Sequence, residues 1–326
     1  MFGRPGGARW REYSTFKLAI SCLASRGPTN TYGELRMSED KESSPLGQAQ
    51  TSVAIVGEIV KLAADSPKAK QAADNLGTAA VTLTKTLTVC LLPLAAVNYA
   101  YDKARIYFQG RFEEDLQAKT AHIPPERLIE PKASVAGPAI QGLAYVADQP
   151  SLRDMYVTLI ATAMDAQTQA SAHPAFVEII RQLTAEEALQ MKPFLLSNPG
   201  IPVVELRETL AGGTSFVTLR THLVNTVDAE TNQPVENRDI ITMIDNWCRL
   251  GLVQVHYDQF FTGDGVYNWV DARPEYQAAV EAATPPMKVS FERGFVAATS
   301  FGRAFADAIG LIPKVIVIDA GTAHME

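Results

Sequence analysis

His173 is the residue of this 326-residue chain that is best placed for chemistry. Asp165 and Glu178 lie near it in sequence, and a histidine beside a carboxylate is a common general base. No Ser or Cys nucleophile accompanies it in a recognisable motif. Pro174 follows directly, and a residue just before a proline-started helix can cap the first helix N–H groups. We therefore expect His173 to be structural, and we assign no catalytic residue.

Other residues capable of chemistry lack the neighbours that a site requires. The acids Glu186–Glu187 and Glu113–Asp115 fall on expected helices, where they favour the helix dipole or the solvent. Gly212–Gly213 lacks the phosphate-loop pattern and is expected to be a turn. The histidines and cysteines occur singly, without metal-ligand spacing. We therefore expect neither a metal site nor a cofactor.

The element that precedes His173 is an apolar helix. Apolar residues recur at three- and four-residue steps from Leu152 to Met164, which predicts one buried helix face. Ser151, with Asp154 three residues later, is expected to cap its start. A polar break follows and separates this helix from the next.

Two further short helices follow the break. His173–Pro174 opens the first of them, and Thr184 with Glu187 forms a capping box that starts the other. Three consecutive helices with apolar faces should pack on one another. The expected buried stripe of the middle helix is Phe176, Ile179, Ile180 and Leu183.

The run HPAFVEIIRQLTAEEA, from His173 to Ala188, resembles the signature of the bacterial abortive infection alpha family. Leu159–Met164 and the proline-marked segment Ile123–Pro131 fit the same family. The resemblance implies a role in phage defence, in which the infected cell stops growing or dies, and it supplies no catalytic residue. The signature residues, which we expect to be structural, are His173, Pro174, Phe176, Ile180, Gln182, Leu183 and Glu187.

Composition indicates a soluble protein of a reducing compartment. Hydrophobic residues make up 47% of the chain and charged residues 20%, with a formal net charge of -7. An acidic chain does not favour nonspecific binding to nucleic acid or to anionic membranes. The three cysteines are far apart and odd in number, which argues against a disulfide framework and for the cytoplasm.

Two N-terminal stretches need separate interpretation. Residues 1–36 are rich in arginine and glycine, and Met37 begins a polar segment typical of a bacterial start. We expect residues 1–47 to be a disordered arm or the product of a misassigned start. Residues 68–118 are expected to be largely helical, with a kink or a break at Pro93. The uncharged segment 86–101 is shorter than the ~20 residues of a spanning helix, so we favour a buried helix over membrane insertion.

After Leu196 the pattern changes at a turn cluster, residues 197–202, which we take as a domain boundary. A helix is expected at 238–250, followed by strands at 252–257 and 266–270 that form a hairpin. A helix that feeds such a hairpin is typical of winged helices. Residues 203–206 and 216–219 are expected to be extended or short helical, with a strand at 294–298 and a helix at 299–309.

Charge argues against DNA as the partner of this second domain. Residues 205–326 carry nine Lys or Arg against sixteen Asp or Glu. The would-be recognition helix has Asp239 and Asp245 as well as Arg238 and Arg249. Because phosphate contacts need a net positive docking face, we interpret the domain as a protein-interaction or dimerisation module.

The sequence thus predicts a mainly α fold, with a helical N-terminal domain followed by a winged-helix-like α+β domain. The expected segments are a 1–47 extension, a helical domain 48–198, a winged-helix-like domain 199–312 and a tail 313–326. We expect a cytoplasmic phage-defence protein, a non-enzymatic sensor or effector that contacts a protein partner or a second copy. Two alternatives stay open: a winged-helix regulator that binds DNA as an oligomer, and a membrane-acting effector that uses segment 86–101.

Overall fold

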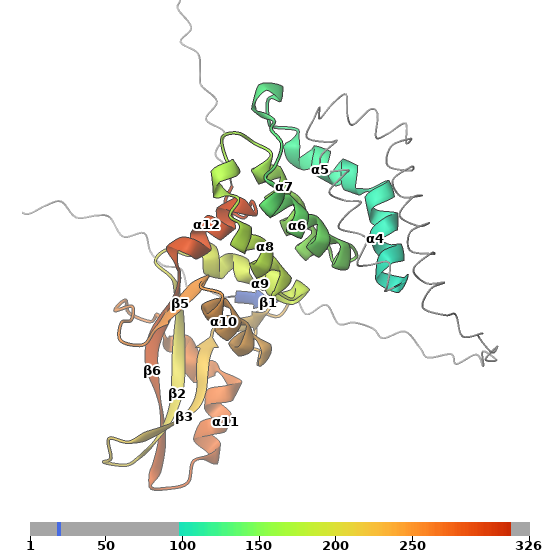
Figure 1. Ribbon diagram of the computed structural model, residues 1–326. Coiled ribbons are helices and arrows are strands. Elements are labelled where there is room, and N and C mark those ends of the chain that lie inside the picture. Colours follow the sequence, from blue (N-terminus) through green and yellow to red (C-terminus); the bar gives the residue numbers. More distant parts are fainter. Residues whose placement is uncertain (1–17, 21–97, 314–326) are drawn as a thin grey trace, which may run out of the picture. The chain divides into compact units, whose positions relative to one another are not determined.

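The computed structural model describes residues 18–20 and 98–313 (Figure 1). They fall into two compact units. The helical unit comprises residues 98–192 and 300–313, and the sheet unit comprises residues 18–20 and 193–299. The helices expected before residue 98, nearly all of the apolar segment 86–101, the N-terminal extension apart from 18–20, and residues 314–326 lie outside the described residues. The domain limits expected from the sequence therefore stay predictions.

The helical unit is an array of short helices in which α7 is central. Nine of the fourteen residues of α7 are buried, and it contacts α5, α6, α8 and α12. A helix that is apolar nearly all round is one that neighbours must enclose. The elements are α4 (Asn98–Gly110), α5 (Phe112–Thr120), the 3₁₀ turn η2 (Pro125–Arg127), α6 (Ala133–Tyr145), α7 (Pro150–Ala163), η3 (Gln169–Ser171), α8 (Pro174–Arg181), the first part of α9 (Ala185–Leu196) and α12 (Ser300–Ala308).

The three helices predicted between residues 151 and 196 are confirmed as α7, α8 and α9. The capping box is also confirmed, because Thr184 N–H donates to Glu187 Oε2 at 2.8 Å and Glu187 N–H donates to Thr184 Oγ1 at 3.1 Å. The cap expected at Ser151 is wrong. Helix α7 begins one residue earlier, at Pro150, and Ser151 Oγ donates to the Ala185 carbonyl instead.

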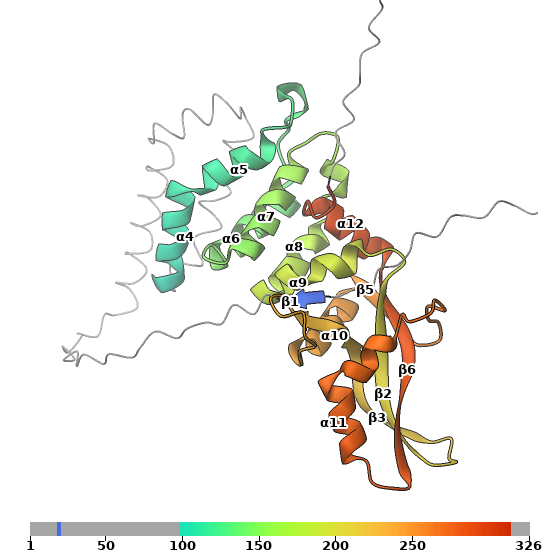
Figure 2. The ribbon, with the colours of Figure 1, turned by 180° about the vertical axis from the view of Figure 1, so that it is seen from behind.

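The sheet unit holds a four-stranded antiparallel sheet in the order β3-β2-β6-β5 (Figures 1 and 2). Register runs Leu206↔Phe291 between β2 and β6, and Val253↔Ala298 between β5 and β6. The pairing of β2 with β3 contains two register shifts, which place bulges on the edge strand β3. The elements are β1 (Leu18–Ile20), β2 (Ile201–Leu210), β3 (Phe216–Val224), β4 (Thr226–Asp228), α10 (Asp239–Arg249), β5 (Val253–His256), η4 (Asn268–Ala272), α11 (Pro274–Ala282) and β6 (Met287–Ala298), with β1 parallel to β4.

One face of this sheet is covered by η4 and α11 (Figure 2). Val204, Leu206 and Leu223 of the strands are buried against residues 267–270. The Tyr276 and Phe291 rings meet edge to face at 5.9 Å between centroids. The other face is also buried at one end of the sheet, where Ile201, Val203 and Val296 lie and where α10 contacts β3 and β5.

The predicted fold class is wrong: the described residues are 49% helical and 19% strand, which makes the fold α+β rather than mainly α. Strand β6 spans twelve residues, whereas only 294–298 was expected to be extended. The strand carries Lys288 and Glu292, residue types that are less common in strands, and they interrupt the apolar pattern. The strands that local patterns missed are long, and each pairs with a strand that is far away in the sequence.

The winged-helix hairpin is also wrong. Residues 266–270 contain a 3₁₀ turn rather than a strand, and β5 pairs with β6 instead. A short apolar run such as Val266–Val270 fits either a strand or a buried turn, and periodicity cannot separate the two. Helix α10 does form close to its expected place, with Ile240, Ile244 and Trp247 buried. Within the described residues, no helix has the length and apolar character needed to cross a bilayer.

Candidate functional site

The signature residues lie on α8 and at the start of α9, where they hold helices together. Phe176 and Ile180 are fully buried. The Phe176 ring lies 5.3 Å from the Phe301 ring and 5.4 Å from the Phe305 ring, both on α12, as measured between centroids. The signature therefore anchors α12 against α8.

His173 is the N-cap of α8. Its Nδ1 accepts the Ala175 N–H at 3.1 Å, and its imidazole is exposed. The two carboxylates near it in sequence have arginine partners, since Asp165 pairs with Arg127 and Glu178 pairs with Arg181. Within the described residues, neither of these carboxylates is hydrogen-bonded to the His173 imidazole.

The other signature residues also make helix-end contacts. Gln182 Nε2 donates to the Glu178 carbonyl at 3.0 Å, in the last turn of α8. Leu183 is buried, Pro174 is the first residue of α8, and Glu187 completes the capping box. The expectation that the signature residues are structural, without a direct functional role, stays a prediction.

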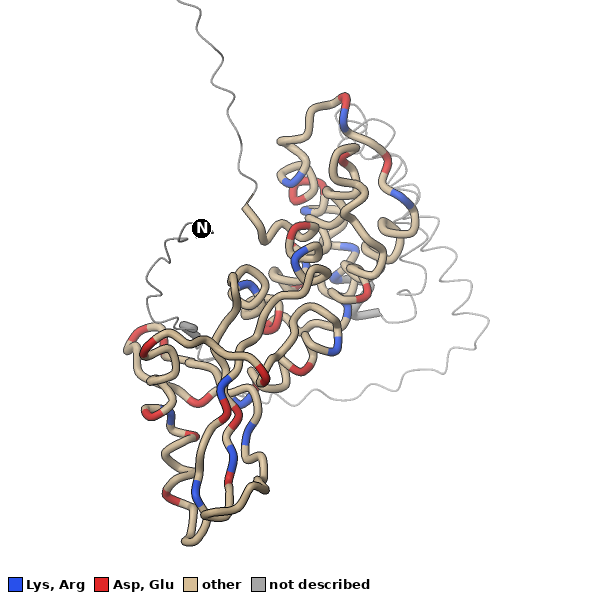
Figure 3. The backbone as a smooth tube through the Cα atoms, turned by 90° about the vertical axis from the view of Figure 1, so that its left-hand side faces the viewer, with Lys and Arg blue, Asp and Glu red and all other residues tan. Residues whose placement is uncertain are grey.

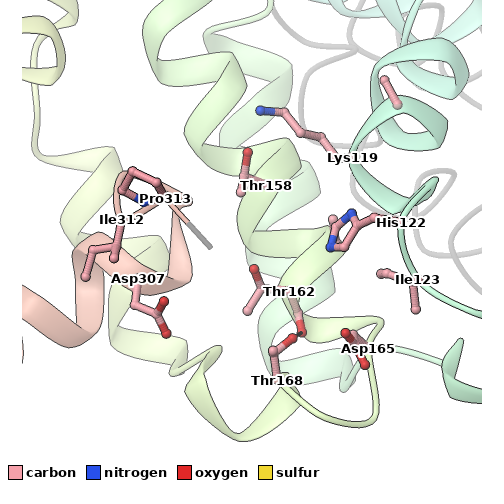
Figure 4. A pocket seen from close by; sticks show the side chains of 13 residues that line it. Lys119, His122, Ile123, Thr158, Thr162, Asp165, Thr168, Asp307, Ile312 and Pro313 are labelled. Carbon is pink, nitrogen blue, oxygen red and sulfur yellow. Dashed lines mark hydrogen bonds between the residues drawn. The ribbon is translucent and has the colours of Figure 1, made fainter. Parts of the chain in front are cut away.

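A cavity of about 260 Å³ lies elsewhere in the helical unit (Figure 4). The end of α5 and the turn after it form one wall, which carries Lys119 and His122. Helix α12 and the residues after it form the facing wall, which carries Asp307. Helix α7 lies between the walls with Thr158 and Thr162. No signature residue lines this cavity.

Some polar groups at the cavity are already satisfied. Asp165, 1% exposed, accepts from Arg127 Nε at 3.0 Å and from the Gln167 N–H at 2.9 Å. The Thr162 hydroxyl donates to the Ala308 carbonyl at 2.8 Å, which ties α7 to α12. These groups stabilise the walls and are not free for a ligand.

Other polar groups at the cavity remain open to a ligand. Thr158 is not one of them, because its hydroxyl oxygen is inaccessible to solvent, although it has no hydrogen-bond partner among the described residues. Asp307 and His122 line the cavity, and no ion pair is formed by either side chain within residues 98–313. Lys119 Nζ lies 2.6 Å from Asp154 Oδ1, and only one of its three N–H groups is needed for that pair.

The cavity has the size and the lining of a binding site for a small molecule. The cavity is at the small end of ligand pockets, and its charged groups are accompanied by Ala118, Ile123, Ala161 and Ile312. In the described part of the chain, no group of three or more His, Cys, Asp or Glu residues is close enough together to hold a metal ion. A small polar molecule is what such a cavity can accommodate.

A second candidate surface is the tip of the β2–β3 hairpin. We call Leu210, Phe216, Val217 and Leu219 the hairpin patch. Their side chains are 51%, 47%, 60% and 39% exposed, respectively. Residues 210–219 contain no charged side chain, and Arg207 stacks on the Phe216 ring at 4.0 Å. Val217 pairs with Glu208 and Phe216 pairs with Thr209, so the patch extends over both faces of the hairpin tip. Exposed apolar side chains gathered on one element often mark a protein contact.

Next to this patch, a polar cluster fixes the edge strand. His222 has a φ of 53°, and its N–H donates to Tyr257 Oη at 3.0 Å. The imidazole lies between Tyr257 Oη, 3.0 Å from Nδ1, and Asp245 Oδ1, 3.1 Å from Nε2. Burial raises the pKa of Tyr257, so the phenol is neutral and its O–H can donate a hydrogen bond to Nδ1. The cluster satisfies a backbone group that the bulge in β3 releases.

Sequence reasoning did not find this cluster, nor the cavity residues Lys119, His122 and Asp307. The members of each set are far apart in the chain and stand in no motif. Figure 3 shows basic and acidic residues interspersed along the strands of the sheet unit. Arg207, for example, pairs with Glu205 at 2.7 Å and with Glu292 at 2.6 Å. Paired cations of this kind do not form a stripe for phosphate contacts.

Comparison with known proteins gives one match. A family model described as abortive infection alpha matches residues 104–309, which is more than half of the chain. Searches of curated proteins and of solved structures found no match.

Proposed function

The chain belongs to the abortive infection alpha family, and from this premise we propose that it protects bacteria against phage as a non-enzymatic sensor or effector in the cytoplasm. The family connects the chain with abortive infection, that is, phage defence. The mechanism, contact with a protein partner, is the part that we add.

The hairpin patch is the observation that carries this mechanism. Four apolar side chains are exposed at one hairpin tip, although the chain as a whole has a formal net charge of -7. Exposed apolar side chains do not stabilise a monomer. A partner that covers them removes apolar surface from water, and this burial stabilises the complex. The alternative of a DNA-binding winged helix rested on a hairpin at residues 252–270. That hairpin does not form, because β5 pairs with β6 and residues 268–272 form a 3₁₀ turn.

A plaque assay tests the proposal. Val217→Lys places a charge in the middle of the patch, and Gln254→Lys places the same charge on an exposed position of β5. We expect cells that express Val217→Lys to lose protection, and cells that express Gln254→Lys to stay protected, at equal protein levels and melting temperatures. Full protection by a folded Val217→Lys protein would contradict a role for the hairpin patch.

A further inference from the structure

The cavity of the helical unit has N–H donors on one wall and a carboxylate on the facing wall. Lys119 and His122 project from the α5 side, and Asp307 projects from α12 (Figure 4). No hydrogen bond or ion pair joins the two sides through these side chains. A ligand that completes the site must therefore bring an acceptor or an anion to one wall, and a donor or a cation to the other.

The other charges at the cavity do not alter this pattern. Asp165 is neutralised by Arg127, and Asp154 is paired with Lys119. Lys119 keeps N–H groups for a second acceptor, because the pair with Asp154 uses one of three. Asp307 is thus the carboxylate on the α12 wall that is open to a ligand.

We propose that this cavity binds a small zwitterion, such as a free amino acid or a short ω-amino acid. Its carboxylate faces Lys119 and His122, and its ammonium faces Asp307. The volume of about 260 Å³ is enough for a molecule of this size.

A series of zwitterions of increasing length tests the proposal on the full chain. The probes are glycine, β-alanine, 4-aminobutyrate, 5-aminovalerate and 6-aminohexanoate, together with L-alanine and L-leucine, each titrated by calorimetry. We expect saturable binding that peaks at one length, with Kd no weaker than about 1 mM. For the best probe, converting the carboxylate to an amide or acetylating the amine should weaken binding about tenfold or more.

Matched variants assign the two walls. Asp307→Asn should weaken the zwitterion at least about tenfold and leave the N-acetyl analogue unchanged. Lys119→Met should weaken the zwitterion and leave the amide analogue unchanged. Glu130→Gln, an exposed carboxylate outside the cavity, is the control for net charge. Absence of saturable binding by every probe, or equal binding of zwitterion and singly charged analogues, would overturn the proposal. These binding measurements do not depend on phage, so their outcome is independent of the plaque assay.

Discussion

Replacing Phe176 with alanine should reveal how strongly the signature contributes to the fold. The side chain is 2% exposed and contacts three rings, those of His173, Phe301 and Phe305. Truncating a phenylalanine in such surroundings costs about 3–5 kcal/mol, through lost burial and the cavity that remains. For a cooperatively folding unit of about 150–250 residues, that corresponds to a fall in melting temperature of about 6–20 °C.

The measurement is thermal unfolding of the full chain, followed by circular dichroism or scanning calorimetry. Phe301→Ala is the matched control, because it removes the ring opposite Phe176 from a side chain that is 39% exposed. We expect its melting temperature to fall by less than half as much. Equal falls, or a smaller fall for Phe176→Ala, would refute the reasoning, since the α8 stripe would then not be a core.

Three more predictions follow from single contacts. His173→Ala removes a cap and should cost about 0.5–2 kcal/mol by denaturant unfolding; protection in a plaque assay should survive, and a stable variant without protection would identify His173 as functional. Arg273→Met leaves the buried Glu275 carboxylate without its partner and should cost about 3–5 kcal/mol, whereas the double variant Arg273→Met/Glu275→Leu should recover part of that loss. Burial raises the pKa of Cys248, so at neutral pH mass spectrometry should find it alkylated more slowly than a model thiol, and an equal rate would show an open site.

The helical unit was predictable where its signals are local. The α7–α9 region combines 3.6-residue periodicity, a proline at a helix start and a capping box, and these signals agree with one another. Ser151 is the exception. A serine followed three residues later by an acid matches the capping pattern, but the proline just before it is the stronger start signal.

The sheet was predicted less well because its stabilising contacts are not local. Strand β6 pairs with β2 across about eighty residues, and its charged positions face water. The residues at 266–270 have strand-like composition, but Trp269 and Val270 are buried against the sheet from a 3₁₀ turn. Local composition indicates that such residues are buried, but not in which conformation.

The signature and the cavity are connected through one helix. Phe176 contacts α12 through Phe301 and Phe305, and the same helix carries Asp307 on the cavity wall. Because Asp307 lies two residues after Phe305, loosening α8 from α12 should displace the carboxylate. We therefore expect Phe176→Ala to weaken binding of the best zwitterion probe even at a temperature where the variant remains folded. Unchanged affinity in that variant would show that Phe176 does not help to position Asp307, and that other contacts of α12, such as the Thr162–Ala308 hydrogen bond, are sufficient.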